Sequence, residues 1–287
     1  MGEFAGIMKR VKEKIRIASD ALRNMRIETR PFYVTSHERS GTHFLINSIN
    51  ANFPIRVGYG LGKGAGHGWN NIGEWFGPYE NKADRYLHIE HYNQVLWEKG
   101  VRRNAVIKSH ADHVLFKKKF RSAPVIYIYR NPVDVMASWF HYLNKDEYYL
   151  NNPAVEDMRS EKFSEFLRRP VNEFLRYSFS EAGRFKNVVE RWAEHTSGWL
   201  SDETACCVRY EDLKNNPDAV LGEISKYLNV PRSGDTSIID IGNSKSILPR
   251  KGNVGDGAKY CGDGDVAFIR ECIERYDLKW DTFNTSA

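Results

Sequence analysis

Residues 32–45 read FYVTSHERSGTHFL, and this stretch decides the fold class. Its first four residues form an apolar, β-rich run that predicts a short strand, and apolar residues at helical spacing predict a helix from about Thr42 to Asn52. The polar turn between them contains Gly41, which allows the backbone to approach a ligand closely. Backbone N–H groups at the start of a helix attract anions, so the junction predicts an anion-binding loop. An ordinary polar turn that caps a helix is the alternative.

The rest of the chain alternates between strand-like and helix-like segments. Further strands are predicted at 105–108, 125–129 and 206–210, and further helices at 132–143, 182–200, 217–228 and 265–276. The strand at 125–129 is almost wholly apolar, as strands are when both faces of a parallel sheet are covered. The alternation therefore predicts an α/β fold, a three-layer sandwich with a central, mostly parallel sheet.

The charge is distributed unevenly over the 287 residues. Residues 1–30 hold eight of the 42 Lys and Arg residues but only four of the 37 Asp and Glu residues, so most of the net charge of +5 lies there. Nucleic-acid binders usually carry basic residues across the folded domain, and this nearly neutral body does not. We expect an amphipathic helix within residues 1–30, followed by one domain over 31–287. This helix could pack on the domain or contact a membrane surface peripherally.

Several features of the sequence bear on the cellular compartment of the protein. The chain has no apolar run long enough to span a bilayer, and residues 1–30 lack the unbroken apolar region of a signal peptide. Its four cysteines form no C-x-x-C pair and suggest no disulfide framework, which favours a reducing compartment. We therefore expect a cytoplasmic protein. No motif indicates a metal, and the oligomeric state is not indicated.

Two further motifs carry basic residues. RNPVDVMAS at 130–138 follows the most apolar strand, so Arg130 lies where α/β sheets place their ligands, and Ser138 in the next helix could grip the same phosphate. Arg130 could instead be a structural partner of Asp134. RKGNVGD at 250–256 places a basic pair in a glycine-containing loop, which suits a phosphate clamp or a solvated loop.

These motifs, in this order, resemble the cytosolic-type sulfotransferase family, whose donor is 3′-phosphoadenosine 5′-phosphosulfate (PAPS). The resemblance covers roughly residues 32–260. Residues 39–44 resemble K-S-G-T-T-W, 130–138 resemble R-N-x-x-D-x-x-x-S, 208–213 resemble the Y-E-D-[LM] strand end, and 250–256 resemble R-K-G-x-x-G-D-W-K. The resemblance implies a P-loop-like fold and a donor site that comprises Arg39, Ser40, Gly41, Thr42, His43, Phe44, Arg130, Ser138, Phe185, Arg250, Lys251 and Gly252.

The resemblance also implies the catalytic residues. KSH at 108–110 resembles the family's K-[TS]-H, in which the histidine is the base, so His110 would deprotonate the acceptor while Lys108 and Arg39 supply positive charge. A histidine near pKa 6.5 can accept a proton at neutral pH. The residues themselves leave the base open, because three other candidates lie near the motifs: Glu38, His37 and His113.

The expected reaction moves a sulfuryl group from PAPS to a hydroxyl or amine of a small-molecule acceptor. Arg39 stands where the family has lysine, and an arginine at this place resembles carbohydrate sulfotransferases. Gly257 replaces a tryptophan, which we expect to loosen the packing around the cofactor. The glycine-rich segment 58–77 and residues 144–180 could shape the acceptor pocket. The alternatives are a nucleoside-triphosphate-dependent phosphotransferase and a non-catalytic nucleotide-binding protein.

Overall fold

The computed structural model describes residues 32–54, 70–71, 106–119, 121–145, 160, 162–170, 187–233, 236 and 253–283. The expected helix within residues 1–30 lies outside the described residues, as do Phe185, Arg250, Lys251 and Gly252. Most of the two segments expected to shape an acceptor pocket also lies outside them. Within the described ranges, no helix combines the length and apolar character needed to cross a bilayer.

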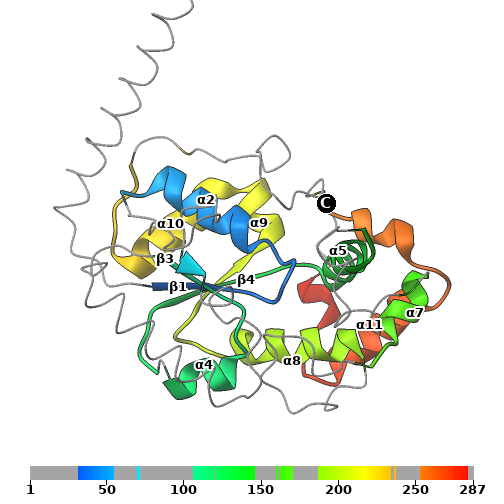
Figure 1. Cartoon of the computed structure of the whole chain (residues 1–287). Helices are drawn as coiled ribbons and strands as arrows, with labels where there is room; N and C mark the ends of the chain where they lie inside the picture. The colour runs from blue at the N-terminus through cyan, green and yellow to red at the C-terminus, as the bar shows by residue number, and fades with distance from the viewer. Residues whose placement is uncertain are drawn as a thin grey trace, which may run out of the picture.

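A parallel sheet forms the centre of the molecule (Figure 1). Its order is β2-β3-β1-β4-β5, and all four strand pairings are parallel. The strands are β1 (Phe32–Thr35), β2 (Asn70–Asn71), β3 (Val106–Ser109), β4 (Val125–Tyr129) and β5 (Cys206–Arg209). Every side chain of β1 is buried, as the apolar character of the inner strands predicts.

Helices cover both faces of the sheet (Figure 1). One face carries α2 (Thr42–Asn52), α9 (Tyr210–Asn215) and α10 (Pro217–Leu228), which share an apolar core with alternate side chains of β1 and β4. The opposite face carries α4 (His113–Lys119) and α8 (Val188–Leu200), whose rings pack on Tyr33 and Tyr127. The predicted three-layer α/β sandwich is therefore confirmed.

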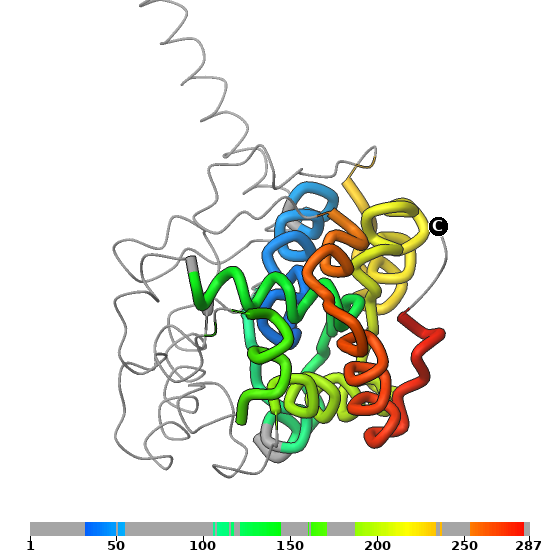
Figure 2. The backbone as a smooth tube through the Cα atoms, turned by 90° about the vertical axis from the view of Figure 1, so that its right-hand side faces the viewer, coloured from blue at the N-terminus to red at the C-terminus, as the bar shows by residue number. Residues whose placement is uncertain are grey.

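A third apolar cluster lies beside the sheet. It joins α8 to α5 (Pro132–Lys145), α7 (Phe163–Leu167) and α11 (Asp265–Glu274). Figure 2 looks onto this side of the molecule, with the orange to red chain from residue 253 in view. Two short 3₁₀ turns, η3 (Asp256–Tyr260) and η4 (Trp280–Thr282), precede and follow α11, and η3 packs on α5.

The strand order fixes where a ligand site can form. β1 and β4 are neighbours, and the chain leaves β1 toward β2 and β3 but leaves β4 toward β5, so the connections that leave these two adjacent strands run in opposite directions along the sheet. Thr35 pairs with Ser109 of β3 and with Tyr127 of β4, which brings the carboxyl ends of the three strands together. Open α/β sheets bind their ligands at such a switch point.

Candidate active site

The loop of residues 36–41, called the anion loop below, connects β1 to α2 at this switch point. Arg39 has a φ of 69° and Gly41 a φ of 102°, so the chain turns sharply before the helix begins. The hydroxyls of Ser36 and Thr42 lie 2.6 Å apart and close the loop across its base. No side chain caps the start of α2. The loop therefore presents a helix N-terminus that suits an anion.

Buried polar atoms at the site include several without a hydrogen-bond partner among the described residues. Among them are the Ser40 hydroxyl, in the loop, and Nε of Arg130, at the end of β4. An unsatisfied buried polar group costs about 1–3 kcal/mol, so native proteins rarely retain one without a reason. An anion rich in acceptor oxygens, such as a phosphosulfate, is a chemically suitable partner for both donors.

Arg39 extends from the loop toward α5. Its Nε donates a hydrogen bond to the Ser138 hydroxyl at 3.2 Å, and its guanidinium carbon lies 4.4 Å from the centre of the Tyr142 ring. The structure thus brings together two residues that are 99 positions apart and that belong to two different sequence motifs. This hydrogen bond connects the motif at residues 39–44 to the motif at residues 130–138.

Arg130 is buried at the end of β4. Its NH2 group donates to Oδ2 of Asp134 at 3.1 Å and to the carbonyl oxygen of Asn253 at 2.7 Å, and its guanidinium lies 4.5 Å from the centre of the Tyr210 ring. The ion pair with Asp134 was one of the two alternatives for Arg130, and it is present. The bond to Asn253 also connects Arg130 to the loop that follows the RKG residues.

The Asp134 carboxylate organises that second loop. It accepts hydrogen bonds from the backbone N–H of Gly255 at 2.9 Å and of Gly257 at 2.7 Å. A Cβ atom at Gly257 would lie 2.6 Å from the carbonyl oxygen of Val133. The small size of Gly257 thus lets the loop approach α5 closely enough to bind the carboxylate, and looser packing around the donor stays a prediction.

Lys108, near the end of β3, points to the start of α2. Its Nζ donates to Nε2 of His43 at 2.9 Å, and the lysine side chain is buried. The positive charge of Lys108 thus lies against the first turn of the helix that follows the anion loop.

His110 follows β3 directly and bonds to the loop itself. Its Nδ1–H donates to the carbonyl oxygen of Ser36 at 2.8 Å, which leaves the lone pair of the neutral ring on Nε2. Burial, with the nearby charge of Lys108, lowers the pKa of His110 to about 4, although Glu38 acts in the opposite direction. The imidazole is therefore neutral at pH 7, the form that can accept a proton.

The other three candidates for the base are each held by a charged side chain. Arg191 donates to both carboxylate oxygens of Glu38, at 3.0 and 3.1 Å, and to Nε2 of His37 at 2.5 Å. Burial acts to raise the pKa of Glu38, but the Arg191 charge overrides it and keeps the pKa well below its usual range. Burial also lowers the pKa of His37 to about 3. His113 lies on α4 and contacts the Asp202 carboxylate at 3.2 Å.

Phe44 and Arg191 differ in how the sequence analysis treated them: Phe44 was predicted as a donor-site residue, and Arg191 was not predicted at all. Phe44 is buried in the core and packs on Tyr210, with ring centres 5.3 Å apart, so a stacking role for it toward a ligand stays a prediction. Arg191 was missed, although the sequence contained a signal. It lies among Val188, Trp192 and other buried residues of an amphipathic helix, where a charged residue requires a partner.

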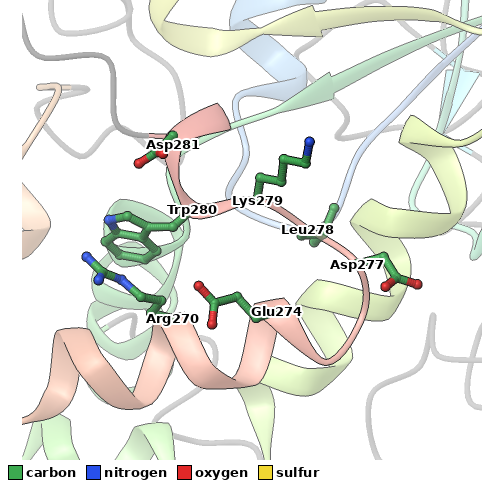
Figure 3. Close-up of a pocket in the computed structure, with 7 residues that line it drawn as sticks. All are labelled: Arg270, Glu274, Asp277, Leu278, Lys279, Trp280 and Asp281. Atoms are coloured by element: carbon green, nitrogen blue, oxygen red, sulfur yellow. The ribbon is translucent and has the colours of Figure 1, made fainter.

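A pocket of about 500 Å³ lies away from this site, between α11 and the turn that leads to η4 (Figure 3). The Arg270 guanidinium rests 5.1 Å from the centre of the Trp280 ring there. Seven residues line the pocket, Arg270, Glu274, Asp277, Leu278, Lys279, Trp280 and Asp281. Its three carboxylates outnumber its two cations, so the features that suit an anion gather at the sheet edge and not in this pocket.

Parallel α/β domains with an anion loop at the switch point typically bind nucleotides, and the present site is of this class. A family model described as the sulfotransferase domain matches residues 30–247, and the chain belongs to this family. Sulfotransferase 6B1 of Danio rerio is 26% identical over 151 residues, which are 46% of this chain and 44% of that protein. A 3-alpha-hydroxysteroid sulfotransferase of Cavia porcellus is 30% identical over 150 residues, 50% of this chain and 45% of that protein.

The matched part is less than half of each of these relatives. Among solved structures, a mouse sulfotransferase complexed with PAP (adenosine 3′,5′-bisphosphate) has a TM-score of 0.55 at 17% identity, and the alignment covers 88% of this chain and 86% of that one. This likeness supports the same α/β fold for the two chains.

Proposed function

We propose that this chain is a sulfotransferase that moves the sulfuryl group of PAPS to a hydroxyl or amine of a small-molecule acceptor. The sulfotransferase family supports the reaction class. Relatives named as an amine sulfotransferase and as a hydroxysteroid sulfotransferase support the acceptor class. The observation that carries the proposal is the hydrogen bond from His110 to Ser36, because it places a neutral imidazole against the first residue of the anion loop.

His110 is the proposed base. Its pKa of about 4 keeps it unprotonated at neutral pH, and its Nδ1–H tautomer puts the basic lone pair on Nε2. Glu38 and His37 are poorer candidates because both share the Arg191 guanidinium. His113, on α4, is hydrogen-bonded to Asp202 and does not contact the loop through any described hydrogen bond.

The donor is proposed to bind along the edge formed by β1, β3 and β4. The backbone of residues 40–43 and the Ser40 hydroxyl would hold the 5′ end, where Arg39 and Lys108 supply positive charge. Arg130 and Ser138 would hold the 3′-phosphate, as the resemblance implies. Phe185 and residues 250–252 complete the proposed site, and they lie outside the described residues.

Bound PAPS supplies a sulfuryl group on a phosphate, and its transfer forms the bond from sulfur to the acceptor while the bridging S–O bond breaks and adenosine 3′,5′-bisphosphate (PAP) leaves. His110 takes the acceptor proton onto Nε2. Lys108 and Arg39 stabilise the negative charge that develops at the bridging oxygen, and the loop fixes the line of attack.

The experiment replaces His110 with alanine and follows PAP release and PAP binding together. Loss of a general base lowers the rate about 10²–10⁴-fold. We therefore expect His110→Ala to lose most turnover while its dissociation constant for PAP stays near that of the wild type. His113→Ala is the matched control, and it should keep both turnover and PAP binding. Full turnover by His110→Ala would move the base to another residue.

A thermal-shift titration separates the alternatives. A ligand present at 100 times its dissociation constant stabilises the folded state by about 2.7 kcal/mol. We expect PAP to raise the melting temperature strongly and ATP with Mg²⁺ only weakly. The reverse order would favour the phosphotransferase. Stabilisation by PAP without PAP release from PAPS, across a panel of steroid alcohols and amines, would favour the non-catalytic binder.

A further inference from the structure

A buried ion pair fastens the anion loop to α8. The Arg191 side chain is fully buried and grips the Glu38 carboxylate with both terminal nitrogens, at 3.0 and 3.1 Å. The same guanidinium donates to Nε2 of His37, and His37 in turn donates from Nδ1 to the carbonyl oxygen of Glu38 at 2.9 Å. Two consecutive loop residues are thus fixed to one helix through a single arginine.

The side chain of Arg39, the next residue, does not point toward α8. Its side chain runs toward α5, where it meets Ser138 and Tyr142, while Glu38 runs toward α8. To make this change of direction, Arg39 adopts a φ of 69°, a left-handed conformation that residues other than glycine rarely take. The loop is therefore held between two helices at the residue proposed to face the sulfonate.

Buried ion pairs contribute little net stability, because the loss of hydration offsets their attraction, and their best-documented role is to fix one geometry. We propose that Glu38 and Arg191 are positioning residues that hold Arg39 in its left-handed conformation in the free protein. The inference rests on the proposed function, since it concerns how the anion loop is shaped before the donor binds. Neither residue acts on the reacting atoms.

The expected loss of PAP affinity without the ion pair follows from the conformation of Arg39. A left-handed residue with a side chain is disfavoured by about ten-fold relative to the right-handed region. Without the ion pair, most molecules would therefore hold Arg39 in a relaxed conformation. Apparent affinity falls in proportion to the population that can bind, so PAP affinity should fall by roughly the same ten-fold.

The test uses Glu38→Gln and Arg191→Met, with Glu190→Gln as the matched control. Glu190 precedes Arg191 on α8, but its carboxylate pairs with Arg275 of the C-terminal region at 2.8 Å and not with the loop. Two quantities are measured for each variant: the dissociation constant for PAP by titration calorimetry, and amide hydrogen exchange of residues 36–43 in the protein without ligand.

We expect Glu38→Gln to bind PAP about ten-fold more weakly and to exchange faster over residues 36–43, while Glu190→Gln matches the wild type in both. Glu38→Gln decides the matter if Arg191→Met does not fold. Wild-type affinity and wild-type exchange in Glu38→Gln would overturn the inference, as would equally fast loop exchange in Glu38→Gln and Glu190→Gln with unchanged PAP affinity. If the wild type does not bind PAP, the proposed function fails, and loop exchange in the free protein still decides whether the ion pair shapes the loop.

Discussion

Replacing Gly41 with alanine tests the geometry of the anion loop directly. The new Cβ atom would lie 2.5 Å from Cδ2 and 3.0 Å from Cε2 of Tyr210, and 3.4 Å from Cδ1 of Ile128. Tyr210 is buried between Phe44 and the Arg130 guanidinium, so its ring has little room to move away. The φ of 102° at Gly41 adds a second cost, because side-chain-bearing residues rarely adopt it.

The two costs can be added. A left-handed conformation costs about 1–2 kcal/mol for a residue with a side chain. Overpacking a buried site costs about 1–3 kcal/mol more. Gly41→Ala should therefore lower the free energy of unfolding by about 2–5 kcal/mol, a large part of the roughly 5–15 kcal/mol typical of a folded protein.

Two other glycines separate the contributions. Gly255 has a φ of 79° but no atom of the described residues within 4 Å of an added Cβ, so Gly255→Ala should carry the conformational cost alone, about 1–2 kcal/mol. Gly222 lies within α10, and no described residue comes within 4 Å of an added Cβ there, so Gly222→Ala should stabilise the protein by about 0.5–1 kcal/mol. The assay is urea unfolding followed by tryptophan fluorescence, with midpoint and slope fitted for each variant.

The order of the three midpoints decides the outcome. We expect Gly222→Ala to unfold at the highest urea concentration, then Gly255→Ala, then Gly41→Ala. A Gly41→Ala midpoint equal to that of Gly255→Ala would show that the contact with Tyr210 carries no energy. A midpoint equal to that of the wild type would refute the loop conformation itself.

Three further predictions concern buried polar groups. Ser40→Ala should leave the stability measured by calorimetry unchanged or slightly raised, because it removes a buried hydroxyl that has no hydrogen-bond partner among the described residues, while PAP affinity falls several-fold; a clear loss of stability would contradict this. Asp134→Asn should lower the free energy of unfolding by about 3 kcal/mol in urea, because it breaks a buried ion pair; a change below about 1 kcal/mol would count against it. Burial lowers the pKa of His37 to about 3, of His110 to about 4 and of His195 well below 6.5, so as the pH falls the unfolded chain binds protons before the folded chain does. The free energy of unfolding should therefore fall from pH 6.5 to pH 4, by at most about 1.4 kcal/mol per pH unit and histidine, and the melting temperature should fall with it; constant stability over this range would refute the burial of these rings.

The sequence predicted the elements whose signals are local. The strands at 32–35 and 125–129 and the helix at 42–52 match the structure at both ends, since unbroken apolar runs and helical spacing depend only on neighbouring residues. The six-residue helix α9 was missed, because the chain passes from β5 into it at Tyr210 without a turn or cap. Residues 70–71 lie within the glycine-rich segment 58–77, where no strand was predicted, and they form the short strand β2.

The convergence of several candidate residues at one edge of the sheet was predictable, but the pairing of their side chains was not. The resemblance selected Arg39, Lys108 and His110, and strand ends in a parallel sheet must converge. Which side chain would hold which could not be derived, because the partners are far apart along the chain. Ser138 is 99 residues from Arg39, and Arg191 is 153 residues from Glu38. Such contacts depend on how α5 and α8 pack on the sheet, and no local pattern encodes this packing.

The hydrogen bonds to Asp134 also bear on the order in which the site is completed during translation. The N–H groups of Gly255 and Gly257 are synthesised 121 and 123 residues after the carboxylate that they bind. Chains fold from the N-terminus as they emerge from the ribosome, so the sheet and α5 are available long before these two amides. Until they arrive, Arg130, four residues from Asp134, is its nearest ionic partner in the sequence. A ribosome-bound chain that ends before residue 253 would thus contain all five described strands and the first anion loop, yet it would lack the second loop that closes over Arg130.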